Sequence, residues 1–330
     1  MALPSSPNSL SINQIAGEFG GSTPHSLSEY YAGGDNVASG IQGDSGAIPS
    51  SGAISIGQFY GSANRISIAL TISSNTNNYQ ISQNRGGTYS SGITDIVLTN
   101  NAQVGSNAVG TAALATGASP NWATGDTITI VNNGAFRGRG GDGGGGMTSA
   151  GASVQAGQAA GDSIEINYPV TVQNTAPGDI YAGGGGGGGG ARGSSVQPGQ
   201  PGNPGNPPSG GKSPSPGQPG QPGNPPSTQF FGGGGGGGGA GSQAGSGGAG
   251  RNSQGQAGQA GSANLTSGGA GGNSTGQTNP NGGAGGANGA AGGQGTGTSD
   301  GAGGAAGKAI EPNGNQLTLN NSGQVIGATS

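Results

Sequence analysis

The sequence predicts a mainly β protein with short N-terminal helical turns and a glycine-rich polyglycine II helical bundle, flanked by β-strand and hairpin repeats. Three observations support this fold class. Serine-capped motifs recur within residues 1–62, alternating apolar and polar stretches begin at residue 65, and two runs of eight glycines occupy 183–190 and 232–239. The predicted parts are an N-terminal docking segment, a small β domain, a glycine-rich domain and a C-terminal β-hairpin. Their ranges are 1–62, 63–136, 137–307 and 308–330.

The composition excludes several classes of protein. Glycine and proline (84 and 20 of 330 residues) reach a level that normally marks low complexity, yet only 6% of residues are charged. The eight Lys and Arg residues are scattered, so we expect no nucleic-acid binding. No apolar stretch reaches the roughly 18 residues of a membrane span, and the first residues lack the pattern of a secretory signal. We therefore also expect no membrane insertion.

Residues 1–62 contain three related motifs that begin S-[IL]-x-[QE]. This spacing is that of a capping box, in which the serine and the third residue after it satisfy each other's backbone N–H. The pairs are Ser11/Gln14, Ser26/Glu29 and Ser55/Gln58. We expect the apolar residues of these turns, Ile12 and Ile15 among them, either to dock onto another protein or to close a self-contained helical cap. The docking candidates are Phe19, Leu27, Tyr30, Tyr31, Phe59 and Tyr60.

Residues 63–136 predict a small β domain in which Leu114 and Trp122 would seal one side. A weak repeat of a strand, an asparagine-containing turn and a short strand or glycine stretch also extends beyond this range. It occupies residues 95–105, 127–141, 169–185 and 316–330. Asparagine and glycine supply the positive φ angles of tight hairpins. These units would either pair into one sheet or stack as rungs, and residues 308–330 would form the C-terminal β-hairpin.

The glycine-rich part, residues 137–307, needs a stabilising device other than an apolar core. Short glycine segments alternate with small polar turns, which favours polyglycine II helices that bond laterally through their backbones. A flexible linker and a collagen helix are the alternatives. The collagen period persists for only about three triplets in each of two places, too few for a stable triple helix.

A proline-rich loop, residues 191–231, lies between the two eight-glycine runs. A loop of this length inside an ordered body is usually either functional or disordered. If the two runs are neighbouring helices, the loop protrudes from one end of the bundle, as a contact site or as a solvated excursion. The candidate contact residues in it are Arg192, Lys212, Phe230 and Phe231, and shorter turns add Asn273 and Asn279.

The sequence contains no motif that predicts a catalytic or cofactor-binding site. The GxGxxG patterns of the glycine-rich part do not stand at a strand-to-helix junction, so they do not predict a dinucleotide site. His25 is the single histidine, and Asp162 and Glu165 are three apart near a strand, which would place them on opposite faces. We expect no catalytic residue, no cofactor and no metal.

Several stretches resemble a known family. "INQIAGEFGGSTPHSLSEYYAGG" with "IPSSGAISIGQFYG" is similar to an N-terminal segment of tailed-phage virion proteins. "GDTITIVNNGAFRGRGGDGGGG", "INYPVTVQNTAPGDIYAGGGGGGGG" and "GAAGKAIEPNGNQLTLNNSGQVIGA" resemble glycine-rich phage tail fibre or receptor-binding proteins. The resemblance extends over nearly the whole chain.

This resemblance implies a non-enzymatic adhesin of the phage tail. Distal tail-fibre adhesins of T-even-like phages present variable loops at the tip of a polyglycine II bundle. By analogy, residues 1–62 would dock onto other phage tail proteins, and the loop candidates would contact a protein or polysaccharide receptor on the host. The chain would then reside in the virion and act outside the cell. Fibres are usually trimeric, so a homotrimer is an alternative to a monomer, although no coiled coil is present.

Two further functions compete with this one. The chain could be purely architectural, in a tail tip, neck or head fibre, with loops that bind nothing on the host. Ice binding by a flat polyglycine II face would require a period-three column of Thr or Ala, and the irregular spacing disfavours it.

Overall fold

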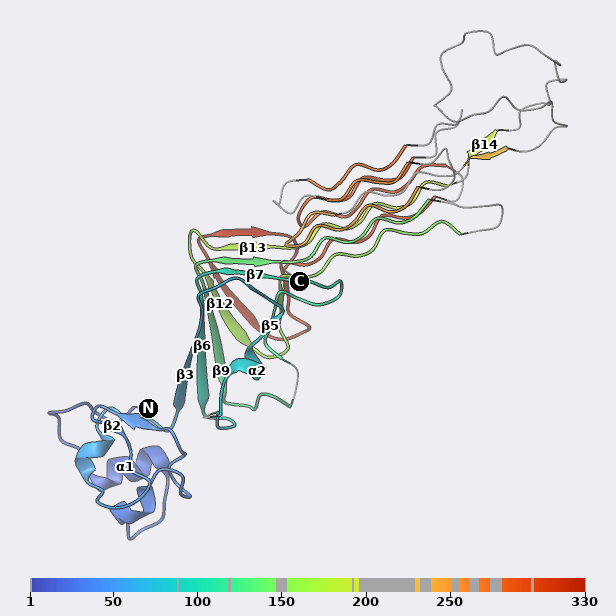
Figure 1. The fold of residues 1–330 in the computed structure, drawn as a ribbon. Coiled ribbons are helices and arrows are strands. Elements are labelled where there is room, and N and C mark those ends of the chain that lie inside the picture. Colours follow the sequence, from blue (N-terminus) through green and yellow to red (C-terminus); the bar gives the residue numbers. More distant parts are fainter. Residues whose placement is uncertain are drawn as a thin grey trace, which may run out of the picture.

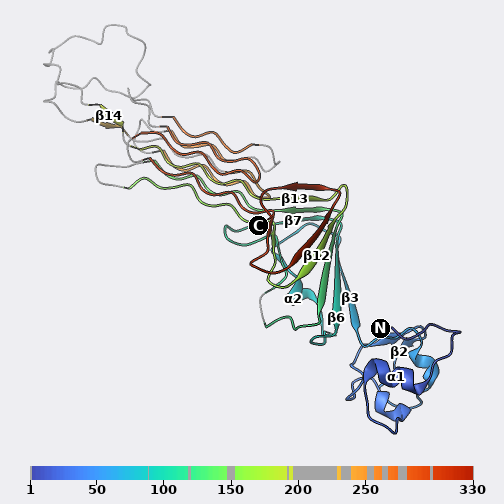
Figure 2. The same ribbon diagram turned by 180° about the vertical axis from the view of Figure 1, so that it is seen from behind.

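The structure is a computed structural model. It describes residues 2–87, 89–117, 120–146, 153–191, 193–195, 229–231, 239–250, 256–261, 267–273, 281–297 and 300–329. These residues form three parts in a row (Figures 1 and 2), namely an N-terminal lobe, a β-structure in the middle and a bundle of extended segments. Most of its regular secondary structure is β-strand.

The N-terminal lobe, residues 2–62, contains the three predicted helical turns. The first is a two-turn α-helix, and the others are single 3₁₀ turns. In each motif the serine N–H donates to the side chain three residues later, at 2.9, 3.2 and 2.7 Å for Ser11, Ser26 and Ser55. The elements are α1 (Ile12–Phe19), η1 (Leu27–Tyr30), η2 (Ile56–Phe59) and the hairpin of β1 (Gln42–Gly43) with β2 (Gly46–Ala47).

The same motifs supply the core of this lobe. Ile15, Tyr30 and Phe59 each stand four residues after a capping serine, and all three are fully buried. Phe59 makes edge-to-face contacts with Phe19 and Tyr30, with ring centroids 6.0 and 6.2 Å apart. The aromatic residues therefore pack against one another, as the self-contained alternative predicts.

The middle of the molecule is a parallel β-solenoid with three sheets. Each of the first four turns of the chain adds one strand to each sheet in succession, and the last turn adds one strand to the first and second sheets. Strands of neighbouring turns pair in parallel. The first sheet contains β3 (Ile66–Ile72), β6 (Thr94–Asn100), β9 (Thr127–Asn132), β12 (Val170–Asn174) and β17 (Leu317–Asn321). The second contains β4 (Thr76–Asn77), β7 (Gln103–Gly105), β10 (Ala135–Arg137), β13 (Asp179–Tyr181) and β18 (Gln324–Ile326). The third contains β5 (Tyr79–Gln80), β8 (Leu114–Ala115), β11 (Ile164–Glu165) and β16 (Ile310–Glu311).

Alternating side chains build the solenoid core. Ile96, Leu98, Ile128 and Ile130 are at most 2% exposed, and their strand neighbours in sequence point outward. Leu114 and Trp122 are both buried, as the sequence predicts. The short helix α2 (Ile81–Asn84) follows the first turn and buries Ile81.

The topology corrects two expectations. The repeats stack as rungs and do not form hairpins, and β17 and β18 pair with different sheets, so residues 308–330 are no C-terminal β-hairpin. The chain bends between β17 and β18 because the apolar side chains of both strands, Leu317, Leu319 and Val325, pack against the solenoid core. Residues 164–181 and 310–326 therefore belong to the same solenoid as residues 66–137, and not to separate parts.

The glycine-rich segments leave the solenoid at one corner. Residues 138–163 connect β10 to β11, and residues 182–309 connect β13 to β16, so each excursion starts after the second sheet and returns into the third. The segments then run side by side away from the solenoid (Figure 1).

Backbone hydrogen bonds between segments hold this bundle together. In the run 183–190, Gly183, Gly186 and Gly189 donate to Gly161, Gln158 and Gln155, in steps of three residues. Gly185, Gly188 and Ala191 donate to a different segment, again in steps of three, at Ala290, Gly293 and Thr296. N–H groups three residues apart therefore point toward the same neighbouring segment.

The first glycine run lies at the centre of the bundle. Gly183–Gly190 are all buried. A Cβ atom at Gly184, Gly186 or Gly188 would lie about 2 Å from a carbonyl oxygen of Gly286, Asp142 or Gly301, at 2.1, 2.0 and 1.9 Å. Neighbouring backbones therefore occupy the space that side chains would need. This close contact explains why this segment contains no residue other than glycine.

Candidate functional sites

The first candidate site is the surface of the N-terminal lobe. Of the predicted docking residues, Phe19, Tyr30 and Phe59 are 5%, 0% and 0% exposed, so they offer a partner almost no surface. Leu27, Tyr31 and Tyr60 are half-buried. Ile12, Leu27 and Ile56 each directly follow a capping serine, and all three are half-buried, so every motif presents one apolar side chain at the same position.

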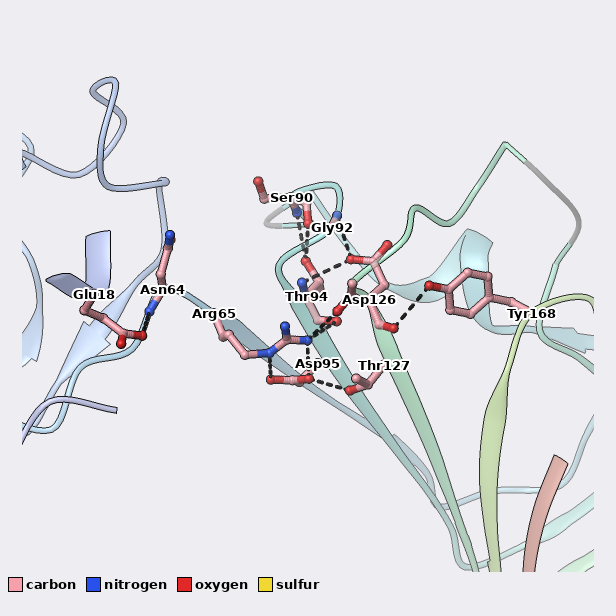
Figure 3. Close-up of polar contacts among 11 residues, drawn as sticks. Glu18, Asn64, Arg65, Ser90, Gly92, Thr94, Asp95, Asp126, Thr127 and Tyr168 are labelled. Atoms are coloured by element: carbon pink, nitrogen blue, oxygen red, sulfur yellow. Dashed lines mark hydrogen bonds and ion pairs between the residues drawn. The ribbon is translucent and has the colours of Figure 1, made fainter. Parts of the chain in front are cut away.

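A polar junction connects the lobe to the solenoid (Figure 3). The backbone N–H of Asn64 donates to Glu18 of α1 at 2.9 Å. Beside it, the Arg65 guanidinium donates to both carboxylate oxygens of Asp95 at 2.5 Å and to the Gly125 carbonyl at 2.9 Å. These contacts fix the chain where it enters β3.

Asp95 and Asp126 are the carboxylates of this junction. Hydrogen bonds from Arg65, and then from Thr127, lower the pKa of Asp95 despite its partial burial. Asp126 is 6% exposed and accepts four hydrogen bonds, which satisfy both of its oxygens. The four donors are the N–H groups of Gly92, Thr94 and Ala123 and the hydroxyl of Tyr89. Asp126 lines a groove on the solenoid, but both of its oxygens already accept hydrogen bonds from the protein, and Asp95 is paired with Arg65, so neither carboxylate is free for general acid–base chemistry.

An aromatic cluster closes the loops next to this junction. The Arg85 guanidinium lies 3.4 Å from the ring centroid of Tyr89 and 4.7 Å from that of Trp122. The Trp122 indole N–H donates to the Thr116 and Gly117 carbonyls, and the Tyr168 hydroxyl donates to the Ala123 carbonyl at 2.6 Å. The Trp122 N–H and the Tyr168 hydroxyl therefore bond to backbone carbonyls of the protein itself, and we interpret this cluster as one that stabilises the loops.

The second candidate site is the far end of the bundle. The strands β14 (Gly193–Ser195) and β15 (Gln229–Phe231) pair there in antiparallel fashion, at the end away from the solenoid (Figures 1 and 2). This pairing brings together the two ends of the proline-rich loop. Phe230 and Phe231 belong to β15, whereas Arg192, Lys212 and Asn279 lie outside the described residues. Asn273 is exposed, and its carbonyl accepts the Gln256 N–H at 2.9 Å.

Sequence reasoning missed a row of asparagines at one corner of the solenoid. Asn100 donates to Asn132, Asn132 to Asn174 and Asn174 to Asn321, through side-chain amides at 2.8, 2.7 and 2.8 Å. The strand register aligns all four, and the first three are fully buried. The signal was present in the sequence, because each repeat places an asparagine at the end of its strand.

The described residues contain no group of three or more His, Asp or Glu side chains that could hold a metal ion. Within the same residues, no helix is both long and apolar enough to cross a membrane.

Comparisons with known proteins found a solved structure and a family model that match this chain. A crystal structure described as the gp37-gp38 adhesin tip complex of the bacteriophage S16 long tail fiber matches with a TM-score of 0.48 and 20% sequence identity. The match covers 85% of this chain and 88% of that chain. No curated protein matches the sequence. The family model described as phage tail fibre adhesin Gp38 matches residues 67–231, which is half of the chain. The chain therefore belongs to the Gp38 family of phage tail fibre adhesins, proteins of the virion that bind a host receptor.

Proposed function

We propose that this adhesin binds its host receptor through loops at the far end of the glycine-rich bundle, and that the bundle consists of polyglycine II helices. The observation that carries the proposal is the pairing of β14 with β15 at that end. The residues on either side of 196–228, Ser195 and Gln229, are register partners in this pair and lie at the end of the bundle away from the lobe.

The hydrogen-bond pattern supports the polyglycine II assignment. That conformation has three residues per turn, and its N–H groups point sideways, so each third donor meets the same neighbour. The donors of residues 183–191 follow this period against two different segments. Parallel and antiparallel neighbours both occur, since Gly141 and Gly144 donate to Gly184 and Gly187, with the numbers of both segments increasing together.

A bundle of this kind suits an adhesin because it is a rigid scaffold to which loops can be attached. Loops attached to a rigid scaffold lose less conformational entropy on binding than loops of a flexible chain. The candidate contact residues are Arg192, Lys212, Phe230, Phe231, Asn273 and Asn279. The receptor would be a protein or polysaccharide on the outside of the host cell.

The N-terminal lobe would attach the adhesin to other proteins of the phage tail. Phe19, Tyr30 and Phe59 close the core of the lobe, so we assign the docking contacts to half-buried apolar side chains, namely Ile12, Leu27 and Ile56. Leu27 is one of the residues that the sequence predicted for this role. Each of the three motifs would thus offer a partner protein one apolar side chain at the same position. The homotrimer stays a prediction.

Binding of the purified protein to host cells tests the receptor proposal. In the decisive variant a short Gly-Ser turn replaces residues 196–228, which retains β14 and β15. In the control variant the same residues stand in scrambled order, with length and composition unchanged. We expect saturable binding of the intact protein and none of either variant.

Each other outcome has a definite meaning. Binding that survives in both variants would contradict the assignment to residues 196–228 and move the site to the turns near Asn273 and Asn279. Binding by the scrambled control alone would show that the bulk of the loop matters and its sequence does not. No binding by folded intact protein would contradict a receptor contact at this end of the molecule.

A further inference from the structure

An open cleft lies on the outer face of the second solenoid sheet, at its corner with the first. It has a volume of about 490 Å³, within the usual range for sites that bind small molecules. It lies where β13 and β18 begin. The cleft is lined by Ala176, Pro177, Gly178, Asp179, Tyr181, Ser322, Gly323 and Gln324.

The cleft contains both hydrogen-bond acceptors and hydrogen-bond donors. Asp179 and Gln324 are register partners on adjacent parallel strands, so their side chains stand side by side. The Tyr181 hydroxyl donates to the side-chain carbonyl of Gln324, which leaves the amide N–H groups of Gln324 available as donors. Burial, and then the neighbouring Asp179, raise the pKa of Tyr181, so the phenol keeps its proton. Ser322 is exposed, and its hydroxyl accepts from the Ala176 N–H and donates to the Asn174 carbonyl, both at 3.4 Å.

The charge in this cleft is balanced. The Asp179 carboxylate lies 3.7 Å from the Arg137 guanidinium, which also lies 5.8 Å from the ring centroid of Tyr181. A carboxylate at the wall disfavours phosphate or another anion, and its pairing with Arg137 reduces the attraction for a cation. An uncharged ligand with several hydrogen-bonding groups fits this environment.

We propose that the cleft binds one neutral saccharide unit of a glycan chain. A sugar hydroxyl both donates and accepts, so vicinal hydroxyls satisfy Asp179 and Gln324 at the same time. The apolar C–H face of the sugar would lie against Ala176 and Pro177. A second groove, on the first sheet, is lined by Asp126, Gln316 and several threonine and apolar residues, has only about 210 Å³ and lacks an aromatic side chain.

This site is independent of the loops at the far end of the bundle. It is formed by the last two rungs of the solenoid, and its test measures direct binding to the purified chain. The host-cell assay on residues 196–228 can therefore fail while this proposal holds, and the reverse is also true.

The test is an NMR titration of the ¹⁵N-labelled full-length protein with methyl glycosides of glucose, galactose, mannose and N-acetylglucosamine. We expect at least one of them to shift the Gln324 side-chain amide and the Gly178 and Gly323 backbone amides in a saturable way. Gln324→Ala should weaken the dissociation constant about three- to ten-fold, as expected for the loss of one or two neutral hydrogen bonds.

Two further variants make the test specific. Gln324→Glu keeps an acceptor for Tyr181 but removes the two donors, and it should weaken binding at least as much as Gln324→Ala. Gln316→Ala makes the same deletion at an exposed position of the same rung and should bind like the parent. The proposal is overturned if no glycoside shifts these amides, if Gln324→Ala binds as tightly as the parent, or if sulfate shifts the same amides more strongly than every sugar.

Discussion

At the residue scale, the glycines of the central run are required by the space around them. A buried leucine is retained because its side chain fills a core, whereas Gly186 is retained because a neighbouring carbonyl fills the position of its Cβ. The entropy that glycine loses on folding is offset by lateral hydrogen bonds, each with a net contribution of about 0.5–1.5 kcal/mol. Because the neighbouring backbones lie so close together, even one added methyl group at the centre of the bundle should disrupt their hydrogen bonds.

Substitution at the centre and at the surface of the bundle should therefore differ sharply. Gly186→Ala would place a Cβ 2.0 Å from the Asp142 carbonyl oxygen, and we expect it to destabilise the bundle by about 1–3 kcal/mol or more. Gly293→Ala is the matched control, because that residue is exposed and the nearest atoms to its Cβ lie at 3.3 Å. Thermal unfolding and amide hydrogen exchange measure the difference. Equal effects of the two variants would contradict the arrangement of these segments.

The junction of the lobe with the solenoid should depend on pH through Asp95. Hydrogen bonds from Arg65 lower the pKa of Asp95 in the folded state. The resulting stabilisation is present above the ordinary aspartate pKa of about 3.9 and is lost as the pH falls through the lower, folded value. Because both side chains are about one-third exposed (35% and 31%), we expect an effect of no more than about 1 kcal/mol.

Comparison with Asp95→Asn isolates this effect. The variant lacks the titrating group, so the free energies of unfolding should differ at neutral pH and converge as the pH falls from about 5 to about 2. Denaturant unfolding at several pH values measures both proteins. A difference that stays constant over this range would show that the Arg65–Asp95 pair does not titrate as described.

At the scale of elements, the asparagine row is the most exacting feature of the solenoid. Its three buried side chains satisfy one another across successive rungs, and Asn132 also donates to the Asp179 carbonyl at 3.1 Å. A row of this kind fixes the register, because a shift of one residue would leave buried amides without partners.

Removal of one member should cost more than the removal of one hydrogen bond. Asn132→Ala leaves the Asn100 donor and the Asn174 acceptor buried and unpaired, and each costs about 1–3 kcal/mol. The control is Asn133→Ala at the next position, which is exposed and whose side chain bonds only to the exposed side chains of Asn101 and Thr175, so its removal should cost no more than about 0.5–1.5 kcal/mol. Thermal or denaturant unfolding measures the stability of the two variants. If both are equally stable, the asparagine row does not stabilise the solenoid.

The elements also show which parts of the fold can be predicted from the sequence. The capped turns at Ser11, Ser26 and Ser55 were predictable because the interactions that form them are local. The existence of the strands was predictable from their alternation. Their pairing was not, because an asparagine–glycine turn is compatible with a hairpin and with the corner of a solenoid. One of the two partners of β12, the strand β17, lies more than 140 residues away, across residues 182–309, and no local pattern identifies it.

The candidate sites divide in the same way. The position of Leu27 directly after a capping serine was predictable from its motif, whereas its part in docking stays a prediction. The burial of Tyr30 and Phe59 was not, since it depends on how three separate motifs meet. The cleft at Asp179 and Gln324 also escaped prediction, because these residues become neighbours only when the rungs stack in register.

At the scale of the whole molecule, the chain separates two surfaces by the length of the solenoid and the bundle. The lobe lies at one end and the β14–β15 pair at the other (Figure 2). If the lobe attaches the adhesin to the tail and the loops contact the host, the two functions should be separable by mutation.

Such separation is the strongest test of this arrangement. Replacement of Ile12, Leu27 and Ile56 by serine should reduce incorporation into phage particles at least ten-fold, because it removes the repeated apolar contacts of the lobe. Purified protein with these three substitutions should still bind host cells. The variant that lacks residues 196–228 should show the opposite, with normal incorporation and no host binding. Quantitative mass spectrometry of purified particles measures incorporation, and Asn13→Ser, an exposed change in the same motif, serves as the control. If the triple variant is folded and still enters particles normally, the attachment surface is not the one formed by the capped turns.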